Sequence, residues 1–512
     1  MISANSETPR WPPSRLMGIV PYFNAGVIVF CSLFVFLAPG VTVLRDLADP
    51  AIRTVGIPAF AWSLHRDLSP KYAAWANARL GSARAAELST HNISGTEWPL
   101  FGSVFYLWAT ESLQDAWEQN HPVGSVAPKV YARDAIAAAT RLVVDPAQAN
   151  WVKIHWGQNY LKTENVFYRM LIISAVTSYT RLSGDREYLP LLRDQADSLA
   201  ADLGASPTGL LNDYPGECYP GDVLTAIAMI HRADQVLGTD HSAFVNRAIR
   251  GFQGGALDLH GLVPYAAFAL RGVPLGPARG CGNSYVSLFS PLIWPDQARK
   301  WYDLYSKYYW QETWVCAGFR EFANDAPGSQ WLFDVDAGPV IDGFGCAACA
   351  FGLGAARVNG HFEQAYPLTA EMLATAWPLP NGTLLFPRLL SNAADAPYLG
   401  EAAILFNLTR LPAAGVPVQT GGSLPRFVLV VLFVQFSLGL VFLVLPIRAM
   451  RKLWMEKPPR EIYRPGLQLV IWAALLTAFL ACLIIGQAMV GALFLAGTQF
   501  LPRYVRKRKV SS

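Results

Sequence analysis

The sequence predicts an all-α protein in which a helical domain of the α/α toroid type is flanked by transmembrane helices. Long uncharged apolar segments lie near both ends of the chain, and the region between them has the charges and turn residues of a globular domain. That region contains one helical apolar pattern after another and little strand-like alternation. A helical solenoid is the alternative, but we find no fixed repeat period of the kind that a solenoid needs.

The first apolar segment, residues 18–44, is predicted to be a transmembrane helix. No charged residue lies between Arg15 and Arg45, and a helix needs about 20 apolar residues to span a bilayer. A cleaved signal peptide is the alternative, but the apolar stretch is long for one and Ala38-Pro39-Gly40 is a poor cleavage site. Residues 1–17 are expected to form a cytoplasmic N-terminal segment.

Two further uncharged segments follow the globular region. Residues 427–447 are predicted to be a transmembrane helix, and residues 466–501 are either one long tilted helix or a tight pair of short helices that turn near Gly486. Residues 502–512 form a basic tail, for which we favour an anchor to lipid headgroups over a nucleic-acid site.

The basic residues that flank the spans suggest an orientation. Arg10 and Arg15 precede the first span, and a basic cluster between residues 448 and 464 follows the second. Cytoplasmic loops are enriched in Lys and Arg, so the globular region is expected on the periplasmic side of a bacterial inner membrane. The basic tail fits this orientation only if the third segment crosses twice.

The globular region, residues 60–412, is large enough to bury one substantial core. Helices are expected, in chain order, at 71–88, 104–118, 130–144, 166–182, 188–203, 223–237, 243–252, 295–313, 347–358 and 367–376. Connections rich in Gly, Pro and Asn are expected at 183–185, 204–209, 276–283 and 380–382. Many helices in one domain favour a central pocket surrounded by inner helices and their loops.

Familiar cofactor and metal motifs are missing from the sequence. The seven cysteines show neither a disulfide framework nor paired zinc-binding motifs, and Cys346 and Cys349 are expected to be small packing residues. The segment Gly343 to Ala348 resembles a dinucleotide fingerprint but is expected to be a close helix contact. We therefore predict no metal and no cofactor.

The motif that carries most chemistry is the doubled phrase from Asp213 to Asp222, Asp-Tyr-Pro-Gly-Glu-Cys-Tyr-Pro-Gly-Asp. It gathers three carboxylates, a thiol and two phenols in one loop, because two Pro-Gly pairs exclude a regular helix or a central strand. An apolar helical run follows at once. The alternative is a structural role for the loop. Asp222 would then be the N-cap of that helix, and the tyrosines would close a hydrophobic corner.

Other acids and aromatic residues recur near predicted loops, and two carboxylates in different environments can serve as acid and base. Each has a structural alternative: Glu164 can pair with Arg169, and Asp334 and Asp336 can fix a turn at Gly338-Pro339. The predicted catalytic residues are Asp213, Glu217, Cys218, Asp222 and Glu97. The predicted substrate-binding residues are Tyr214, Tyr219, Glu164, His155, Trp156, Tyr285 and Asp336.

The globular region resembles the linalool dehydratase/isomerase family, best from about residue 156 to 240. The resemblance is carried by Glu164-Asn165 before an aromatic helix, by Tyr179-Thr-Arg-Leu-Ser-Gly-Asp-Arg-Glu-Tyr188, by Gly209-Leu-Leu, by the doubled acidic loop and by Gly238-Thr-Asp240. It implies an (α/α)6 barrel and a pocket that dehydrates or isomerises a tertiary allylic terpene alcohol without a cofactor.

The chain departs from the family pattern at four positions. A gapless register places Asp213 and Asp222 where the family has two cysteines, with Cys218 between them, and Leu171 where it has a histidine. Glu97 stands where the family has an aspartate near its N-terminal helix.

Three functions follow from these observations. The leading one is a membrane-anchored lyase or isomerase that acts on a hydroxylated apolar substrate, such as a terpenoid, which would partition into the lipid bilayer. The second is a glycan-acting enzyme, because paired carboxylates also cleave glycosides and sixteen tryptophans can supply sugar platforms. The third is a non-catalytic membrane-assembly component whose barrel binds a partner.

Overall fold

A computed structural model describes residues 15–120, 126–326, 330–455 and 465–484, together with residues 491, 494, 495, 497 and 498. Helices account for 66% of it and strands for 6%, which confirms the predicted all-α class. The greater part of the predicted N-terminal segment 1–17, the Gly486 turn and the basic tail 502–512 lie outside the described residues. The chain divides into a terminal unit, Met1–Val41 with Leu432–Ser512, and a central unit, Thr42–Val431.

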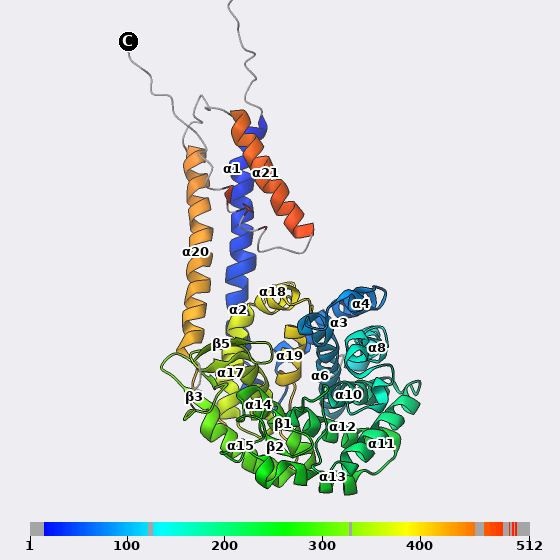
Figure 1. The fold of residues 1–512 in the computed structure, drawn as a ribbon. Helices are drawn as coiled ribbons and strands as arrows, with labels where there is room; N and C mark the ends of the chain where they lie inside the picture. Colours follow the sequence, from blue (N-terminus) through cyan, green and yellow to red (C-terminus); the bar gives the residue numbers. More distant parts are fainter. Residues whose placement is uncertain are drawn as a thin grey trace, which may run out of the picture. The chain divides into compact units, whose positions relative to one another are not determined.

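The terminal unit consists of long apolar helices (Figure 1). A continuous helical stretch is formed by α1 (Arg15–Cys31), the π-helical η1 (Ser32–Leu37) and α2 (Ala38–Leu47); α20 (Arg426–Met455) and α21 (Pro465–Ile484) follow near the C-terminus. Two segments, Phe23–Leu47 and Arg426–Arg448, are long and apolar enough to cross a membrane. They coincide with the first two predicted spans.

Polar contacts join the helices of the terminal unit. The Ser32 hydroxyl donates to the Gly439 carbonyl at 2.6 Å, and the Trp472 indole donates to the Asn24 side chain at 3.0 Å. Small residues and single side-chain hydrogen bonds are the usual means by which apolar helices associate in lipid. The third predicted span, 466–501, begins as α21, which ends at Ile484 within the described residues.

The central unit is built from helices joined by short loops and small hairpins. Its helices are η2 (Pro50–Ile52), α3 (Ala59–Leu80), α4 (Arg84–Glu87), α5 (Ile93–Thr96), α6 (Trp98–Asn120), α7 (Pro128–Tyr131), α8 (Arg133–Val144), α9 (Asn150–Trp156), η3 (Tyr160–Lys162), α10 (Val166–Ser183), α11 (Leu189–Ala205), α12 (Pro220–Leu237), α13 (Ser242–Ala248), η4 (Ile249–Phe252), η5 (Gly254–Ala256), α14 (Gly280–Ile293), α15 (Pro295–Tyr309), α16 (Cys346–Val358), α17 (Phe362–Ala376), α18 (Leu385–Ala393) and α19 (Leu399–Leu408).

Three small antiparallel sheets lie between these helices. Strands β1 (Ala267–Phe268) and β2 (Val273–Pro274) form one hairpin, and β3 (Trp310–Glu312) pairs with β4 (Ala317–Phe319). The third sheet has the order β5 (Trp331–Asp334), β6 (Gly338–Ile341) and β7 (Phe344–Gly345).

The long helices of the central unit pack in sequence, with α6 against α10, α10 against α12, α12 against α14, α14 against α16, α16 against α19, and α19 against α6. A second set of helices packs on these: α8 on α6 and α10, α11 on α10 and α12, α15 on α14, and α17 on α16. Figure 1 shows the helices of the central unit side by side. One continuous apolar cluster forms their core.

The two sets of helices differ in their sequence patterns. Residues are buried on all sides of α6, α10 and α12, and such helices are hydrophobic all round because they lie inside a large core. By contrast, α15 buries one stripe, Ala298, Trp301, Tyr302, Tyr305 and Tyr309, at three- and four-residue spacing. That spacing identifies a helix with one face on the core and the other in solvent.

Three predicted boundaries are wrong. The predicted connection 276–283 includes the start of α14 at Gly280, where a Cβ would lie 1.9 Å from the Arg320 carbonyl oxygen, so the glycine serves close packing and not a turn. The predicted helix 295–313 ends at Tyr309 because the next residues pair as β3 with β4. The predicted helix 71–88 begins earlier, at Ala59, and its first part ends at Leu80.

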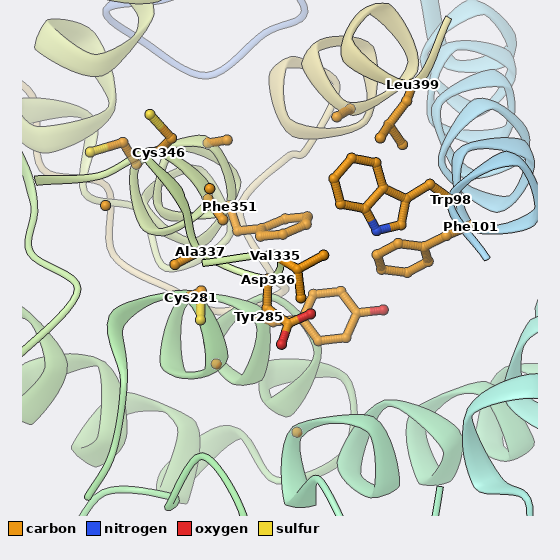
Figure 2. Close-up of a pocket in the computed structure, with 18 of the residues that line it drawn as sticks. Trp98, Phe101, Cys281, Tyr285, Val335, Asp336, Ala337, Cys346, Phe351 and Leu399 are labelled. Carbon is orange, nitrogen blue, oxygen red and sulfur yellow. The ribbon is translucent and has the colours of Figure 1, made fainter. Parts of the chain in front are cut away.

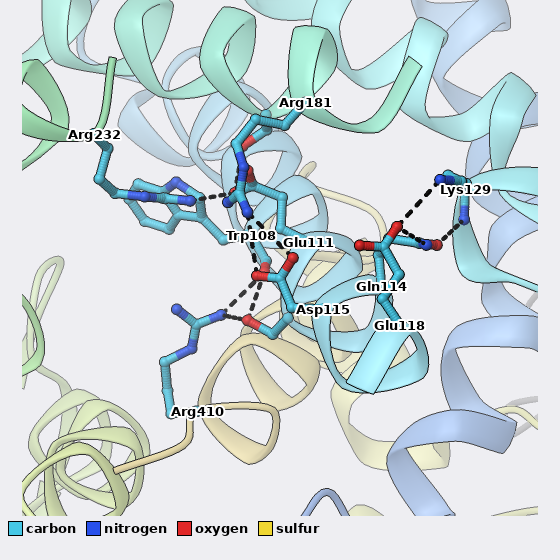
Figure 3. Close-up of polar contacts among 11 residues, drawn as sticks. Trp108, Glu111, Gln114, Asp115, Glu118, Lys129, Arg181, Arg232 and Arg410 are labelled. Carbon is cyan, nitrogen blue, oxygen red and sulfur yellow. Dashed lines mark hydrogen bonds and ion pairs between the residues drawn. The ribbon is translucent and has the colours of Figure 1, made fainter. Parts of the chain in front are cut away.

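A buried ion cluster fixes the C-terminal half of α6 (Figure 3). The carboxylate of Glu111 accepts from Arg181 at 2.9 Å, from Arg232 at 2.6 Å and from the Ser178 hydroxyl at 2.9 Å. Burial alone would raise the pKa of Glu111, but Arg232 and Arg181 more than offset it and the pKa is lowered. The cluster thus joins α6 to α10 and α12 through one ionised carboxylate.

Arg410, two residues after the end of α19, also reaches this end of α6. Arg410 donates to the Trp108 carbonyl at 3.0 Å and hydrogen-bonds the Ser112 hydroxyl. The Arg410 guanidinium therefore links the end of α19 to α6, the helix that carries Glu111.

We predict that Glu111→Gln destabilises the protein by about 3–5 kcal/mol, because it removes a buried carboxylate and leaves the partly buried Arg232 without its ion-pair partner. The matched control on the same helix is Glu118→Gln. Glu118 pairs with Lys129 at 3.1 Å with both side chains about half exposed, and such surface pairs contribute less than about 1 kcal/mol. Urea unfolding of the detergent-solubilised full chain measures both variants, and equal losses would contradict the role given to Glu111.

Candidate active site

A cavity of about 1320 Å³ lies inside the central unit. It is lined by residues in the N-terminal turns of α6, α10, α12, α14, α16 and α19, by one face of α17 and by α18. The N-terminus of a helix carries a partial positive charge, and this charge favours anionic groups placed there. Several helix N-termini therefore face the same space, which is suited to holding carboxylates.

One wall of the cavity is aromatic. Phe101 packs on Phe105 with ring centroids 4.2 Å apart, and Tyr285 lies edge-on to Phe101 at 6.0 Å and to Phe351 at 5.4 Å. Figure 2 shows the rings of Phe101, Tyr285 and Phe351, with Trp98 on one side and Asp336 beside Tyr285. An apolar wall with a few polar groups beside it is the usual form of a small-molecule site.

The first half of the acidic loop is a tight turn. Tyr214 and Glu217 pair as a bridge, with the Glu217 amide donating to the Tyr214 carbonyl at 2.9 Å. Pro215 and Gly216 are the central residues, and Gly216 has φ +86°. This turn requires positive φ at its third residue, so glycine is needed there. The turn directs the side chains of Tyr214 and Glu217 to the cavity.

The second half of the loop repeats the sequence but not the structure. Pro220 and Gly221 are the first residues of α12, a position at which proline is favoured because its missing amide hydrogen has no helical partner. Asp222 consequently lies in the first turn of α12 and not at its N-cap, which is Tyr219. The N-cap alternative for Asp222 is therefore wrong, and its side chain lines the cavity.

Two predicted substrate-binding residues hold this loop from outside the cavity. The Trp156 indole donates to the Asp213 carbonyl at 3.2 Å, and the Glu164 carboxylate accepts from the Asn212 amide at 2.6 Å. Glu164 does not pair with Arg169, which instead pairs with Asp202 at 2.8 Å. Neither Trp156 nor Glu164 is among the cavity-lining residues, so both position the loop.

Glu97 lies at the start of α6 and faces the cavity. Burial, followed by the nearby carboxylates of Asp336, Asp222 and Glu217, raises its pKa to about 7, while a hydrogen bond with the Tyr214 phenol opposes the shift. Because Tyr214 donates to Glu97, it stabilises the ionised form. This carboxyl is divided between its two protonation states at neutral pH.

Asp222 and Asp213 form a second acidic pair. Burial raises the pKa of Asp222 to about 7, and Asp336 adds to the shift. Burial also raises the pKa of Asp213, with Asp222 as the next cause. Asp213 is 1% exposed, and its carboxylate accepts from the Tyr219 amide at 2.7 Å. An ionised Asp222 disfavours ionisation of Asp213, and this repulsion adds to the effect of burial.

Asp336 reaches the cavity from the turn between β5 and β6. It accepts a hydrogen bond from the Tyr265 phenol, and burial raises its pKa. Arg279 stacks on the Tyr265 ring at 4.3 Å and pairs with Asp334 at 3.4 Å. These contacts hold the β5–β6 turn, so Asp334 keeps the structural role that the sequence left open while Asp336 faces the cavity.

The remaining predicted residues are divided between cavity and core. Glu217 and Tyr219 line the cavity, with the Tyr219 phenol donating to Glu217 at 3.1 Å, and so does His155, whose ring lies 5.5 Å from that of Tyr214. Cys218 is fully buried in the apolar core and is not a lining residue. Burial raises the pKa of its thiol, so it stays protonated and packs.

Sequence reasoning missed Glu371 and Tyr265. Glu371 faces the cavity from α17, accepts from the Ala317 amide at 2.9 Å, and has its pKa raised by burial to about 7. An acid in an amphipathic helix normally marks the solvent face, and the residues next to Tyr265, Val263, Pro264 and Ala266, are all apolar, so neither gave a signal. Within the described residues, no group of three or more His, Cys, Asp and Glu is placed to hold a metal ion.

The sequence matches no protein-family model and no curated protein. The resemblance to linalool dehydratase/isomerase therefore stays a prediction. At the position of that family's histidine, Leu171 is fully buried and does not line the cavity. Asp213 and Asp222, at the positions of its two cysteines, lie together, and one of them faces the cavity.

We predict that the protein loses stability as the pH rises from about 4.5 to 7, in part through Glu97. Its pKa is higher in the folded chain, about 7, than its ordinary value of 4.5, so folding takes up a proton in this range. One proton corresponds to a slope of about 1.4 kcal/mol per pH unit. Urea unfolding at several pH values should give a shallower slope for Glu97→Gln.

The control for this experiment is Glu118→Gln, whose carboxylate has a lowered pKa because Gln114 and Lys129 hydrogen-bond it. Its slope between pH 5 and 7 should equal that of the wild type. A Glu97→Gln slope equal to the wild-type slope would show that Glu97 is ionised throughout this range.

Proposed function

We propose that this protein is a membrane-anchored lyase or isomerase that uses carboxyl groups to remove or move the hydroxyl of a largely apolar alcohol of the terpenoid class. The observation that carries the proposal is the placement of two acids, Glu97 and Asp222, in one aromatic cavity, each with its pKa raised by burial to about 7. A catalytic acid or base works best when its pKa lies near the working pH.

The two acids have different environments, which supports different roles. Glu97 receives a hydrogen bond from Tyr214, and this bond favours its ionised form as the base. Asp222 lies against Asp213 and Asp336, and its carboxyl receives no hydrogen bond from the described residues, so the protonated form is favoured as the acid.

In the proposed reaction, Asp222 protonates the substrate hydroxyl, the carbon–oxygen bond breaks, and water leaves. Glu97 takes a proton from a carbon next to the cationic centre, and the electron pair of that C–H bond forms the alkene. One proton is given and one is taken, so the reaction is balanced without an oxidant or reductant. The aromatic wall of Phe101, Phe351 and Tyr285 suits a transient allylic cation, because ring faces attract cations.

The packing of the helices supports the toroid that the sequence predicts. We propose that α6, α10, α12, α14, α16 and α19 form the inner layer of an (α/α)6 barrel. Each packs on the next, α19 packs on α6, and residues in the first turns of all six line one cavity. A common direction of six inner helices is what such a barrel requires.

The apolar wall favours an apolar substrate over a glycan. A sugar needs polar partners along most of its surface, whereas aromatic and aliphatic side chains from α6, α16, α17 and α19 cover much of this cavity. The two apolar spans of the chain fit an inner-membrane anchor, with the central unit on the periplasmic side as the flanking charges indicate.

We predict that membranes carrying this protein convert a C10 tertiary allylic alcohol, tested as linalool, to an alkene or an isomeric alcohol, and that Asp222→Asn or Glu97→Gln lowers the rate by about 10²- to 10⁴-fold. Gas chromatography of linalool, geraniol and myrcene measures the conversion. Glu118→Gln, on the surface of the same unit, should keep the wild-type rate. No conversion by the wild type would rule out these substrates.

The rate should depend on pH with a maximum close to 7. Glu97 has to be ionised and Asp222 protonated, and the two have pKa values of about 7, so the active combination is depleted on both sides. Measuring the initial rate between pH 5 and 9 tests this. A rate that rises steadily to pH 9 would contradict an acid role for Asp222.

A further inference from the structure

The rim of the cavity exposes large apolar side chains from two separate segments. Val335 and Ile341 of the β5–β6 hairpin and Leu390 of α18 all line the cavity, and their exposed fractions are 39%, 49% and 71%. Monomeric proteins seldom expose contiguous apolar side chains without a function, and such patches mark surfaces that bind proteins or membranes.

The β5–β6 hairpin extends this rim outward. Trp331 pairs with Ile341 and Phe333 pairs with Pro339, and residues directly opposite in an antiparallel pair project from the same face. On this face Trp331 is 68% and Phe333 is 79% exposed. The opposite face carries Val340, which is 1% exposed and packs in the core. The hairpin is thus apolar on both faces, and the face of Trp331 and Phe333 is the more exposed, since Leu332 beside Val340 is 39% exposed.

The rim is continuous with the start of a predicted membrane span. Phe427, in the first turn of α20, lines the cavity, and its amide donates to the Val315 carbonyl at 3.0 Å. The adjacent Trp314 is 76% exposed, and the Arg426 guanidinium lies 4.4 Å from the centre of its ring. The candidate span Arg426–Arg448 begins at these residues, so Phe427 belongs both to the cavity lining and to the first turn of that span.

We propose that the exposed hairpin face of Trp331 and Phe333, together with Trp314 and Leu390, is a docking surface for a phospholipid bilayer. We propose also that the cavity opens onto the lipid. Tryptophan and arginine side by side at the end of an apolar helix are typical of the membrane–water interface. A phospholipid surface accounts for the exposed aromatic residues and the exposed leucine together, since Leu390 and Ile341 line the same cavity as Phe427 and Trp314 packs on Arg426.

The docking surface gives the substrate a direct route. On the proposed function, an apolar alcohol dissolved in the bilayer passes Leu390, Ile341 and Phe427 and enters the cavity without crossing water. Its concentration at the cavity is then set by its partition into lipid, because apolar molecules gain free energy in proportion to the apolar surface that they bury.

The test places the photoreactive residue p-benzoylphenylalanine at Phe333 in the full chain, reconstituted in phosphatidylcholine vesicles whose acyl chains carry an alkyne tag. The matched control is the same residue at Leu270, which is 84% exposed in the turn of the β1–β2 hairpin and does not line the cavity. Since both side chains are exposed, neither change should disturb folding. Irradiation should tag the Phe333 variant with lipid several-fold more than the Leu270 variant.

Equal tagging of the two variants, or none in either, would overturn the docking surface. This result is independent of turnover: lipid tagging at Phe333 in a protein that converts no terpenoid alcohol would leave the docking surface standing and remove the proposed function. In an active protein, Phe333→Asp should raise the KM expressed as mole fraction of substrate in the bilayer and leave kcat unchanged, whereas a change in kcat alone would contradict the entry route.

Discussion

The convergence of helix N-termini on one cavity is the constraint on which the rest of the site depends. The carboxylates of Glu97 and Asp222 lie in or beside the first turns of α6 and α12, where helix dipoles favour negative charge. Burial and neighbouring acids oppose that charge. The balance of these effects leaves each pKa near neutrality, so a space that is otherwise apolar can both give and accept protons.

This balance needs a rigid framework, because a carboxyl that moves into water regains its ordinary pKa. Much of the rigidity comes from α6, whose N-terminal half carries Trp98, Phe101 and Phe105 to the cavity. Its C-terminal half is fixed by Glu111 and its arginine partners. The N-terminal end of α6 thus contributes side chains to the cavity, and its C-terminal end contributes the ion cluster that stabilises the fold.

The fold class, the first two spans and several helices could be predicted because their signals are local. Apolar periodicity identified α10, α12 and α16 to within a few residues. Gly280 shows why local reading fails elsewhere: glycine normally marks a turn, but this one lies against the Arg320 carbonyl, a contact between segments 40 residues apart that no local pattern reveals.

The site was predictable in the same partial way. The acids of the doubled loop could be identified from the sequence. However, the same motif, Tyr-Pro-Gly, forms a turn at Tyr214 and begins a helix at Tyr219. Only the fold therefore separates Asp222, in the cavity, from Asp213 and Cys218, which are buried. Glu371 gave no signal because its burial depends on the approach of β4 to α17, which the sequence of α17 does not contain.

The acidic cluster also determines what would block the cavity. A lipophilic amine offers an apolar body to the aromatic wall and an ammonium group to Glu97 and Asp222, whose pKa values burial and the neighbouring acids raise. Pairing would lower the pKa values of these carboxyls, and the protons released would pass to solvent. Cationic amphiphiles, rather than neutral analogues of an alcohol, are therefore expected to inhibit such a site. Their affinity should increase as the pH rises, up to the pH at which the amine loses its charge.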